Sequence, residues 1–399
     1  YGIGYAAVQG FSVQVAQFIG GKKLQHSRDT FRQGMICVTV FALLVSAIGV
    51  VISPYLPGWL GATPEIYLGA YDYFLVYMLG MPVVMLRILA TAMLQSSGSM
   101  KSASFFNSIM CVLDIGFNAL FIFPAAYASV LGYDIWWPGL DFGIKGAALG
   151  TVAAEGITGS ILLYLAVLRR KYTRQKAGMK WKFTRSCLVD ALKISGPIAL
   201  EQGVLTGAMI AMMLIVSPLG TVAIAANSFA ITAEAFCYMP GAGIAIAATT
   251  LVGQSIGANK PDFARGFAWF SLGTGMVTMG ILGAVMYIIA PAVFAFLTLN
   301  VNVQELGTEV LRIQLLAEWL FAASIVGAGA LRGARDTVFS SVMNLLSMWG
   351  IRMPLALYLV DLYGLRGVWT AMCLEIYMRG LLFLIRIYKQ KWDKRGAME

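Results

Sequence analysis

Two oxygen-bearing side chains, Asp114 and Asn118, stand four residues apart inside an apolar segment that spans 102–124. Residues four apart share one face of a helix, and Asp114 lies about 18 Å into this segment at 1.5 Å per residue. Carboxylate and amide oxygens one turn apart suit a hard cation such as Na⁺, and a carboxyl beside a hydrogen-bond partner can instead take up a proton. The pair therefore predicts an ion-coupling site. The alternative is a structural hydrogen bond between helices or a pair with Arg87.

Three glutamates, Glu201, Glu234 and Glu318, also fall within apolar segments. An ionisable side chain at membrane depth is costly, and it is usually functional or paired inside a helix bundle. Glu201 follows Pro197 by four residues, at an expected kink. Glu234 precedes a Met-Pro-Gly-Ala-Gly run at 239–243, where a helix is expected to bend. We expect these glutamates to line a substrate cavity.

Two other charged pairs are expected to be structural. Glu375 and Arg379 are four residues apart and can neutralise each other on one helix. Arg332 and Asp336 bracket a tight turn and are candidates for a second pair.

Other chemistries have little support in the sequence. The five cysteines have no paired spacing, and the single histidine, His26, stands in a polar loop. There is no Ser/His/Asp set and no phosphate-binding loop. We therefore expect no enzyme, no cofactor and no metal beyond Na⁺ at the Asp114 site.

The elements that must position these residues are transmembrane helices. Hydrophobic residues make up 59% of the 399 positions and charged residues only 12%, about half the charged fraction of a soluble domain. Apolar runs long enough to cross a bilayer predict eleven helices in an all-α integral membrane protein. They lie near 1–18, 33–54, 68–95, 102–124, 143–168, 188–216, 222–254, 266–297, 306–331, 337–361 and 364–387.

Basic residues predict the orientation of these helices. Lysines and arginines gather in the 19–32 loop, in a linker at 169–187 and after 386, while the loops on the opposite side hold few. Positive loops face the cytoplasm, so the C-terminus is predicted to be cytoplasmic in a multi-pass protein of the inner or plasma membrane. The same pattern explains the net charge of +10 without nucleic-acid binding.

The chain contains an internal repeat. Val15-Ala-Gln-Phe-Ile-Gly-Gly-Lys-Lys23 matches Val252-Gly-Gln-Ser-Ile-Gly-Ala-Asn-Lys260, and at the same spacing 94–99 matches 331–336. Parallel repeats about an axis along the membrane normal are typical of secondary transporters. We predict an incomplete N-terminal bundle at 1–168, a basic linker at 169–187, and a complete C-terminal bundle at 188–399 with a short basic tail.

The repeated segments also resemble a known family. Gln254-Ser-Ile-Gly-Ala-Asn259 resembles the eighth-helix signature of bacterial MATE (multidrug and toxic compound extrusion) exporters, and Leu331-Arg-Gly-Ala-Arg-Asp-Thr337 is similar to their signature between helices ten and eleven. Leu120-Phe-Ile-Phe123 followed by Gly143-Ile-Lys-Gly-Ala-Ala148 resembles their passage from helix five to helix six. The resemblance implies two pseudo-symmetric six-helix bundles, with helix one and part of helix two absent from this chain.

The resemblance also bears on the sites. The family's first-lobe cation site uses an Asn-x-x-x-Asp pair, a threonine on helix six and an aspartate on helix one. Here the pair is reversed as Asp114 and Asn118, and Thr151 falls at the threonine position. Second-lobe carboxylates of the family would correspond to Leu205 and Phe321, about one turn from Glu201 and Glu318.

The internal repeat predicts a secondary transporter working by alternating access, which we expect to be a monomer with the substrate and the lipid bilayer as its partners. The family resemblance implies an antiporter that exports small organic, cationic compounds in exchange for Na⁺ or H⁺. The alternative is a flippase for lipid-linked saccharide precursors, which requires several basic cavity residues to bind pyrophosphate. Only Arg87, Arg352 and Arg379 are candidates for that role.

Overall fold

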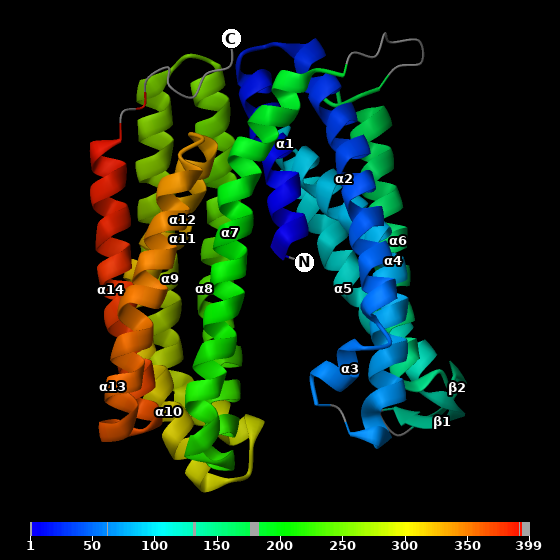
Figure 1. Ribbon diagram of the computed structural model, residues 1–399, viewed down its shortest axis with the longest axis vertical. Helices are drawn as coiled ribbons and strands as arrows, with labels where there is room; N and C mark the ends of the chain where they lie inside the picture. Colours follow the sequence, from blue (N-terminus) through cyan, green and yellow to red (C-terminus); the bar gives the residue numbers. More distant parts are fainter. Residues whose placement is uncertain (1, 62, 131–132, 176–182, 391, 393–399) are drawn as a thin grey trace. The chain divides into compact units, whose positions relative to one another are not determined.

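The computed structural model describes residues 2–61, 63–130, 133–175, 183–390 and 392, and it is almost entirely helical (Figure 1). π-helical turns follow α6 at Leu165–Arg169 and join α12 to α13 at Met348–Arg352, and a short 3₁₀ turn, Ser217–Leu219, follows α7. The elements in chain order are α1 (Gly2–Gly20), α2 (Leu24–Ile52), α3 (Leu56–Trp59), α4 (Pro64–Ser96), α5 (Met100–Ile122), β1 (Pro124–Val130), β2 (Tyr133–Leu140), α6 (Gly143–Tyr164), α7 (Arg185–Val216), α8 (Thr221–Gly257), α9 (Pro261–Leu297), α10 (Val301–Leu315), α11 (Glu318–Gly333), α12 (Thr337–Ser347), α13 (Met353–Tyr363) and α14 (Leu365–Lys389).

Nine helical segments of the described chain are long and apolar enough to cross a membrane. A tenth span results if α10 and α11, which meet at a 57° bend, are taken together. Long apolar helices are expected because a bilayer offers no partner for free backbone N–H and C=O groups. These ten segments and α1 correspond one by one to the eleven predicted helices. The prediction of a multi-pass helical membrane protein is confirmed.

The all-α prediction missed one element, a hairpin of two antiparallel strands. Pro124 pairs with Leu140, and Val130 pairs with Tyr133. The predicted spans 102–124 and 143–168 leave this segment as a connection between two helices. Its content of tyrosine, tryptophan and valine favours extended backbone, but the run is too short to have stood out beside the long helical spans.

The chain divides into two compact units. The first comprises Ile3–Val15 and Leu24–Val189, and the second comprises Ala16–Lys23 and Asp190–Glu399. The second unit therefore includes the end of α1. The predicted linker lies partly at 176–182 and the predicted basic tail mostly at 393–399, both outside the described residues. The predicted limits of the two bundles stay a prediction.

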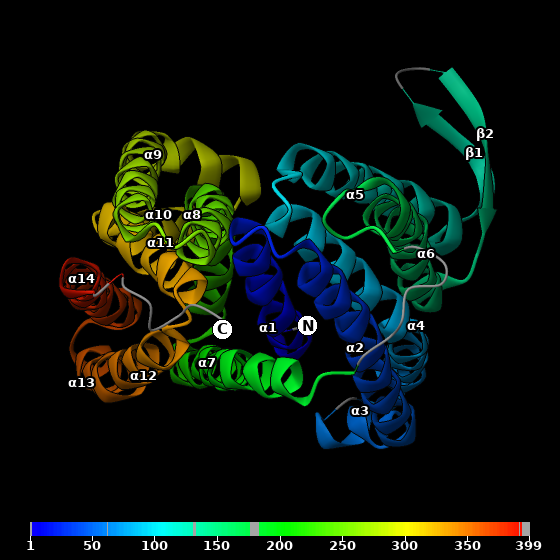
Figure 2. The same cartoon turned by 90° about the horizontal axis from the view of Figure 1, so that it is seen from above.

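In the first unit, α4 packs against both α2 and α6, and α5 packs against α6 (Figure 2). The buried face of α4 carries large apolar side chains such as Met85, Leu89 and Met93. In the second unit, α8, α9, α11 and α14 form the core. Its largest fully buried side chains include Phe294, Trp369 and Phe383. Each unit thus has its own apolar core, in which a few polar side chains are held.

The repeat is visible in the backbone hydrogen bonds of the helix ends. At the end of α1, Lys22 N–H donates to Ile19 O at 3.1 Å and Lys23 N–H to Phe18 O at 2.9 Å. At the end of α8, the N–H groups of Asn259 and Lys260 donate in the same register to the carbonyls three and five positions earlier, those of Ile256 and Ser255. This is the Schellman pattern, whose turn residue adopts positive φ: φ is 56° at Lys22 and 57° at Asn259.

A second pair of helix ends repeats the same turn. Ser99 N–H donates to Leu94 O after α4, and Asp336 N–H donates to Leu331 O after α11. The turn residues, Gly98 and Arg335, both have positive φ. Two matching turns at one constant spacing support the predicted duplication.

The ends of α1 and α8 also approach each other closely. A Cβ at Gly20 would lie 1.8 Å from the carbonyl oxygen of Gln254, and a Cβ at Gly257 would lie 1.9 Å from the carbonyl oxygen of Gln17. The amide of Gln17 in addition donates to Gly333 O at 3.2 Å, at the end of α11. Backbone meets backbone here, so only glycine fits at either position.

Candidate functional site

In the first unit, a buried charge cluster joins α4, α5 and α6. The guanidinium of Arg87 forms an ion pair with Glu155, and Arg87 Nη1 donates to Asn107 Oδ1 at 2.9 Å. Arg87 and Glu155 are each only 6% exposed. Arg87 is thus paired with Glu155, and the ion pair with Asp114 that had been an alternative does not form.

Asp114 and Asn118 keep free oxygen atoms beside this cluster. Oδ1 of each is buried and has no hydrogen-bond partner among the described residues. Asp114 also interacts electrostatically with Glu155. A carboxylate and an amide oxygen without donors suit a cation, because buried polar atoms otherwise pay a desolvation penalty.

Helix α6 lies directly against Asn118. A Cβ at Gly150 would lie 2.3 Å from Asn118 Oδ1, so the glycine allows this approach. Thr151 follows on the same helix, but its hydroxyl bonds neither Asp114 nor Asn118 in the described hydrogen-bond set. The structure therefore brings α5 and α6 together at Asn118, and Thr151 is the residue after the glycine that makes this contact. No group of three or more His, Cys, Asp or Glu side chains that could hold a metal occurs within the described ranges.

In the second unit, Glu201 accepts hydrogen bonds from α12. Asn344 Nδ2 donates to Glu201 Oε1 at 2.8 Å, and Ser341 Oγ lies 3.3 Å from Glu201 Oε2. Ser341 Oγ is also 2.7 Å from the carbonyl oxygen of Pro197, near the predicted kink in α7. Neutral donors therefore hold this buried carboxylate in place.

A second carboxylate, Glu375, lies between two arginines. Arg352 Nε and Nη2 donate to Glu375 Oε2 at 3.1 and 2.6 Å. Arg379 Nε lies 3.1 Å from Glu375 Oε1, which confirms the expected pair of Glu375 with Arg379. Arg379 Nη1 also lies 3.3 Å from Asn344 Oδ1, so the two carboxylates are joined through one amide. Sequence reasoning gave Arg352 no partner, because Glu375 stands on a different helix.

The other two glutamates of this unit are placed differently. Glu234, on α8, faces a cavity and the side chain of Gln314. Glu318 is 0% exposed, its oxygens have no hydrogen-bond partner among the described residues, and it is not part of the cavity wall. It begins α11 immediately after the bend from α10.

The cavity has a volume of about 620 Å³ and lies between α7, α8, α11, α12 and α14. Volumes in this range hold drug-sized compounds. Its apolar wall is rich in methionine, which adapts to ligands of varied shape. Charged and amide side chains interrupt that wall: Glu201, Gln202, Asn227, Glu234, Arg332, Asn344, Arg352 and Arg379.

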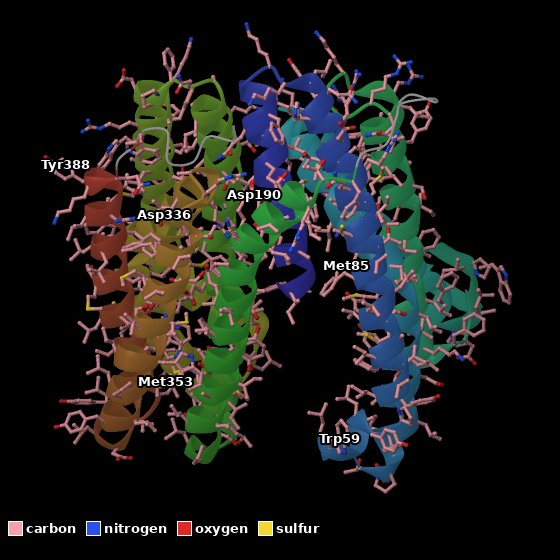
Figure 3. The ribbon with its side chains drawn as sticks, turned by 45° about the horizontal axis from the view of Figure 1, so that its top comes forward. Trp59, Met85, Asp190, Asp336, Met353 and Tyr388 are labelled. Carbon is pink, nitrogen blue, oxygen red and sulfur yellow. The ribbon has the colours of Figure 1, made fainter. Side chains whose placement is uncertain are left out.

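Ion pairs at one end of the second unit are structural. Arg386 pairs with Asp336 at 2.5 Å, and Arg335 lies 3.6 Å from Asp190. Asp190, Asp336 and Tyr388 all lie toward this end, and Met353 lies toward the other (Figure 3). The expected pair of Arg332 with Asp336 is wrong, because Asp336 turns toward α14 and Arg386.

A membrane-spanning bundle with an internal repeat and a mixed apolar and charged cavity defines a transporter-like membrane protein. The sequence model of the MatE family matches residues 1–120 and 197–358, more than half of the chain. The chain belongs to the MatE family of exporters.

Several relatives are known by sequence. One is a probable multidrug resistance protein NorM of Thermotoga maritima, 24% identical over 98% of this chain and 82% of the relative. Another is a probable NorM of Brucella suis, 28% identical over 70% of this chain and 59% of the relative. The uncharacterized transporter YisQ of Bacillus subtilis is 23% identical over 97% of this chain and 83% of the relative.

Solved structures share the fold. The Vibrio cholerae MATE transporter VcmN in its bent form aligns with a TM-score of 0.85 at 16% identity, over 97% of this chain and 84% of that one. A Pyrococcus furiosus transporter, described as having a binding pocket of reverse polarity, aligns with a TM-score of 0.87 at 17% identity, over 98% and 86% of the chains. The two-bundle fold predicted from the sequence is confirmed.

Proposed function

We propose that the protein is a secondary active antiporter that exports small organic compounds in exchange for an inward flow of Na⁺ or H⁺. The observation that carries this proposal is the 620 Å³ cavity inside the second unit, which combines a methionine-rich wall with buried charges. Such a cavity binds amphiphilic compounds of varied shape. The relatives named as multidrug resistance proteins support the same class of substrate.

Ion coupling is assigned to the first unit. Oδ1 of Asp114 and Oδ1 of Asn118 are buried without a donor among the described residues, and Thr151 follows Gly150, the residue of α6 that approaches Asn118. Binding of Na⁺ or a proton there would favour one of two orientations of the transporter. Substrate would favour the other, since a ligand shifts such an equilibrium only by binding the two states with different affinity.

The orientation in the cell membrane follows from the basic turns. Lys22, Lys260 and Arg335 stand at helix ends that share one end of the second unit in Figure 1. We propose that this end is cytoplasmic, so that export runs away from it.

The export proposal is tested with the purified chain in proteoliposomes. An imposed inward Na⁺ or proton gradient is expected to drive efflux of a preloaded fluorescent organic dye, and collapse of the gradient with an ionophore should stop it. Dye movement that is equal in empty liposomes, or independent of both gradients, would contradict antiport.

The coupling site is tested by Asp114→Asn, which removes the charge and keeps the shape. Gradient-driven transport should fall at least tenfold, while dye binding to the detergent-solubilised protein should stay within about twofold of wild type. Asp361→Asn, on the exposed side of α13, is the matched control. Intact ion dependence in Asp114→Asn would show that coupling lies elsewhere.

The flippase alternative is not favoured by the charges. Arg87 is matched by Glu155, and Arg352 and Arg379 share Glu375. A multiply charged pyrophosphate would therefore meet little uncompensated positive charge.

A further inference from the structure

We propose that Arg352 and Arg379 form a binding site for one anionic group, a carboxylate, on the exported compound. This inference rests on the proposed function in one respect, namely that the bound molecule is the exported compound. It departs from the cationic class that the family resemblance implied.

The charges of the second unit lead to this assignment. Two guanidiniums lie in ion-pair distance of a single carboxylate, Glu375, which is 0% exposed. Among the described residues, no carboxylate oxygen of Glu201 or Glu234 forms an ion pair within 4 Å of a guanidinium nitrogen of either arginine. Glu201 and Glu234 act on Arg379, and Glu234 on Arg352, electrostatically from beyond that distance, so among the described residues the two guanidiniums share a single carboxylate in direct contact.

The hydrogen bonds leave room for a ligand. Arg352 donates hydrogen bonds from Nε and Nη2 and Arg379 from Nη1, while Arg379 Nε lies in ion-pair distance of Glu375 Oε1 without a hydrogen bond. Arg352 Nη1 and Arg379 Nη2 therefore have no acceptor in the described part of the chain. The two residues are only 8% and 4% exposed, and both line the cavity. Guanidinium nitrogens without a protein acceptor at a cavity wall suit the oxygens of a carboxylate.

The surroundings indicate what else the compound carries. Arg379 lies over the ring of Phe321, 5.6 Å from its centroid, and Tyr238 packs edge-on against the same ring. Met348 and Arg352 belong to the π-helical turn between α12 and α13, which brings both to the cavity wall. An aromatic or aliphatic body would lie on this wall with its carboxylate at the arginines. The other charged groups facing the cavity are Glu201, Glu234 and Arg332.

Binding of three matched probes to the full chain in detergent micelles tests the proposal: 2-naphthylacetate, its methyl ester and 2-naphthylmethyl-trimethylammonium. The acid is expected to bind about tenfold more tightly than the ester, as for a charge-assisted hydrogen bond. Equal affinity for acid and ester, or a preference for the cation, would overturn the proposal. The wild-type ratio decides this even if a variant does not fold.

Variants then locate the site. Arg379→Gln and Arg352→Gln each leave one arginine matched by Glu375, and each should bring the acid-to-ester ratio close to one. Because the acid and the ester are measured on the same preparation of each variant, partial unfolding reduces the binding of both probes alike and leaves their affinity ratio unchanged. Arg366→Gln, at an exposed pair with Glu309 in the same unit, is the control and should keep the wild-type ratio. An unchanged ratio in both cavity variants would place the anion elsewhere and refute the assignment.

Binding and export fail separately in this design. If the acid binds preferentially but no probe moves in proteoliposomes under either gradient, the proposed function fails and the anion site stands. If the ester and the cation are exported while the acid neither binds nor moves, the anion site fails and the proposed function stands.

Discussion

Substitution of Arg87 by methionine is expected to destabilise the first unit strongly. The change removes the cation of a buried ion pair and leaves Glu155, 6% exposed, without its counter-ion inside the helix bundle. Breaking a buried pair in this way costs about 3–5 kcal/mol. The hydrogen bond to Asn107 is lost as well, which adds about 1 kcal/mol.

The double variant Arg87→Met with Glu155→Leu separates the charge from the packing. It removes both ions and replaces them with apolar groups of similar volume, so its stability should return to within about 2 kcal/mol of wild type. The resulting double-mutant cycle should then give a coupling energy of at least about 2 kcal/mol.

Equilibrium unfolding in mixed micelles, followed by tryptophan fluorescence over an SDS titration, measures all four proteins. Two results would refute the reasoning. One is a loss below about 1 kcal/mol for Arg87→Met, which would mean that Glu155 is not effectively buried. The other is a double variant that is no more stable than the worse single variant, which would mean that packing and not charge dominates.

Two further predictions concern stability. Gly20→Ala and Gly257→Ala place a Cβ less than 2 Å from a backbone oxygen, and each should lower the free energy of unfolding by about 1–3 kcal/mol in the same titration. Gly203→Ala in α7, which has open space at its Cβ, should be neutral or stabilising by up to about 1 kcal/mol. Similar losses at all three positions would contradict the steric argument. Arg366→Gln breaks the ion pair with Glu309, whose side chains are 57% and 50% exposed. It should change the free energy of unfolding by less than about 1 kcal/mol, and by less still in high salt. A larger loss that does not depend on salt would show that the pair is buried in the folded protein.

The sequence determines the spans well because lipid imposes a simple rule on them. Each predicted apolar segment corresponds to a helix or to a bent helical pair, since an apolar run of this length in a bilayer has few alternatives to a helix. The hairpin at Pro124–Leu140 escaped this rule because it lies outside the apolar spans.

Polar partners were harder to predict. The pair of Glu375 with Arg379 was predictable because both stand on one helix, four residues apart. The partners of Glu155 and Asp336 were not, because they stand on other helices, and the rotation of one helix against another is set by packing along its whole length. The role of Arg352 depends on the same rotation and on a π-helical turn that the sequence does not reveal.

The contact between the ends of α1 and α8 has a consequence for divergence of the two repeats. Gly20 meets the carbonyl of Gln254, and Gly257 meets the carbonyl of Gln17. Gly257 is the repeat counterpart of Gly20 and Gln254 is that of Gln17, so the two contacts are equivalent. This is the self-complementary geometry of a two-fold dimer interface, retained within one chain. Duplication ordinarily frees one copy to drift while the other is conserved. At these glycines neither copy is free, because a side chain in either repeat obstructs the same contact.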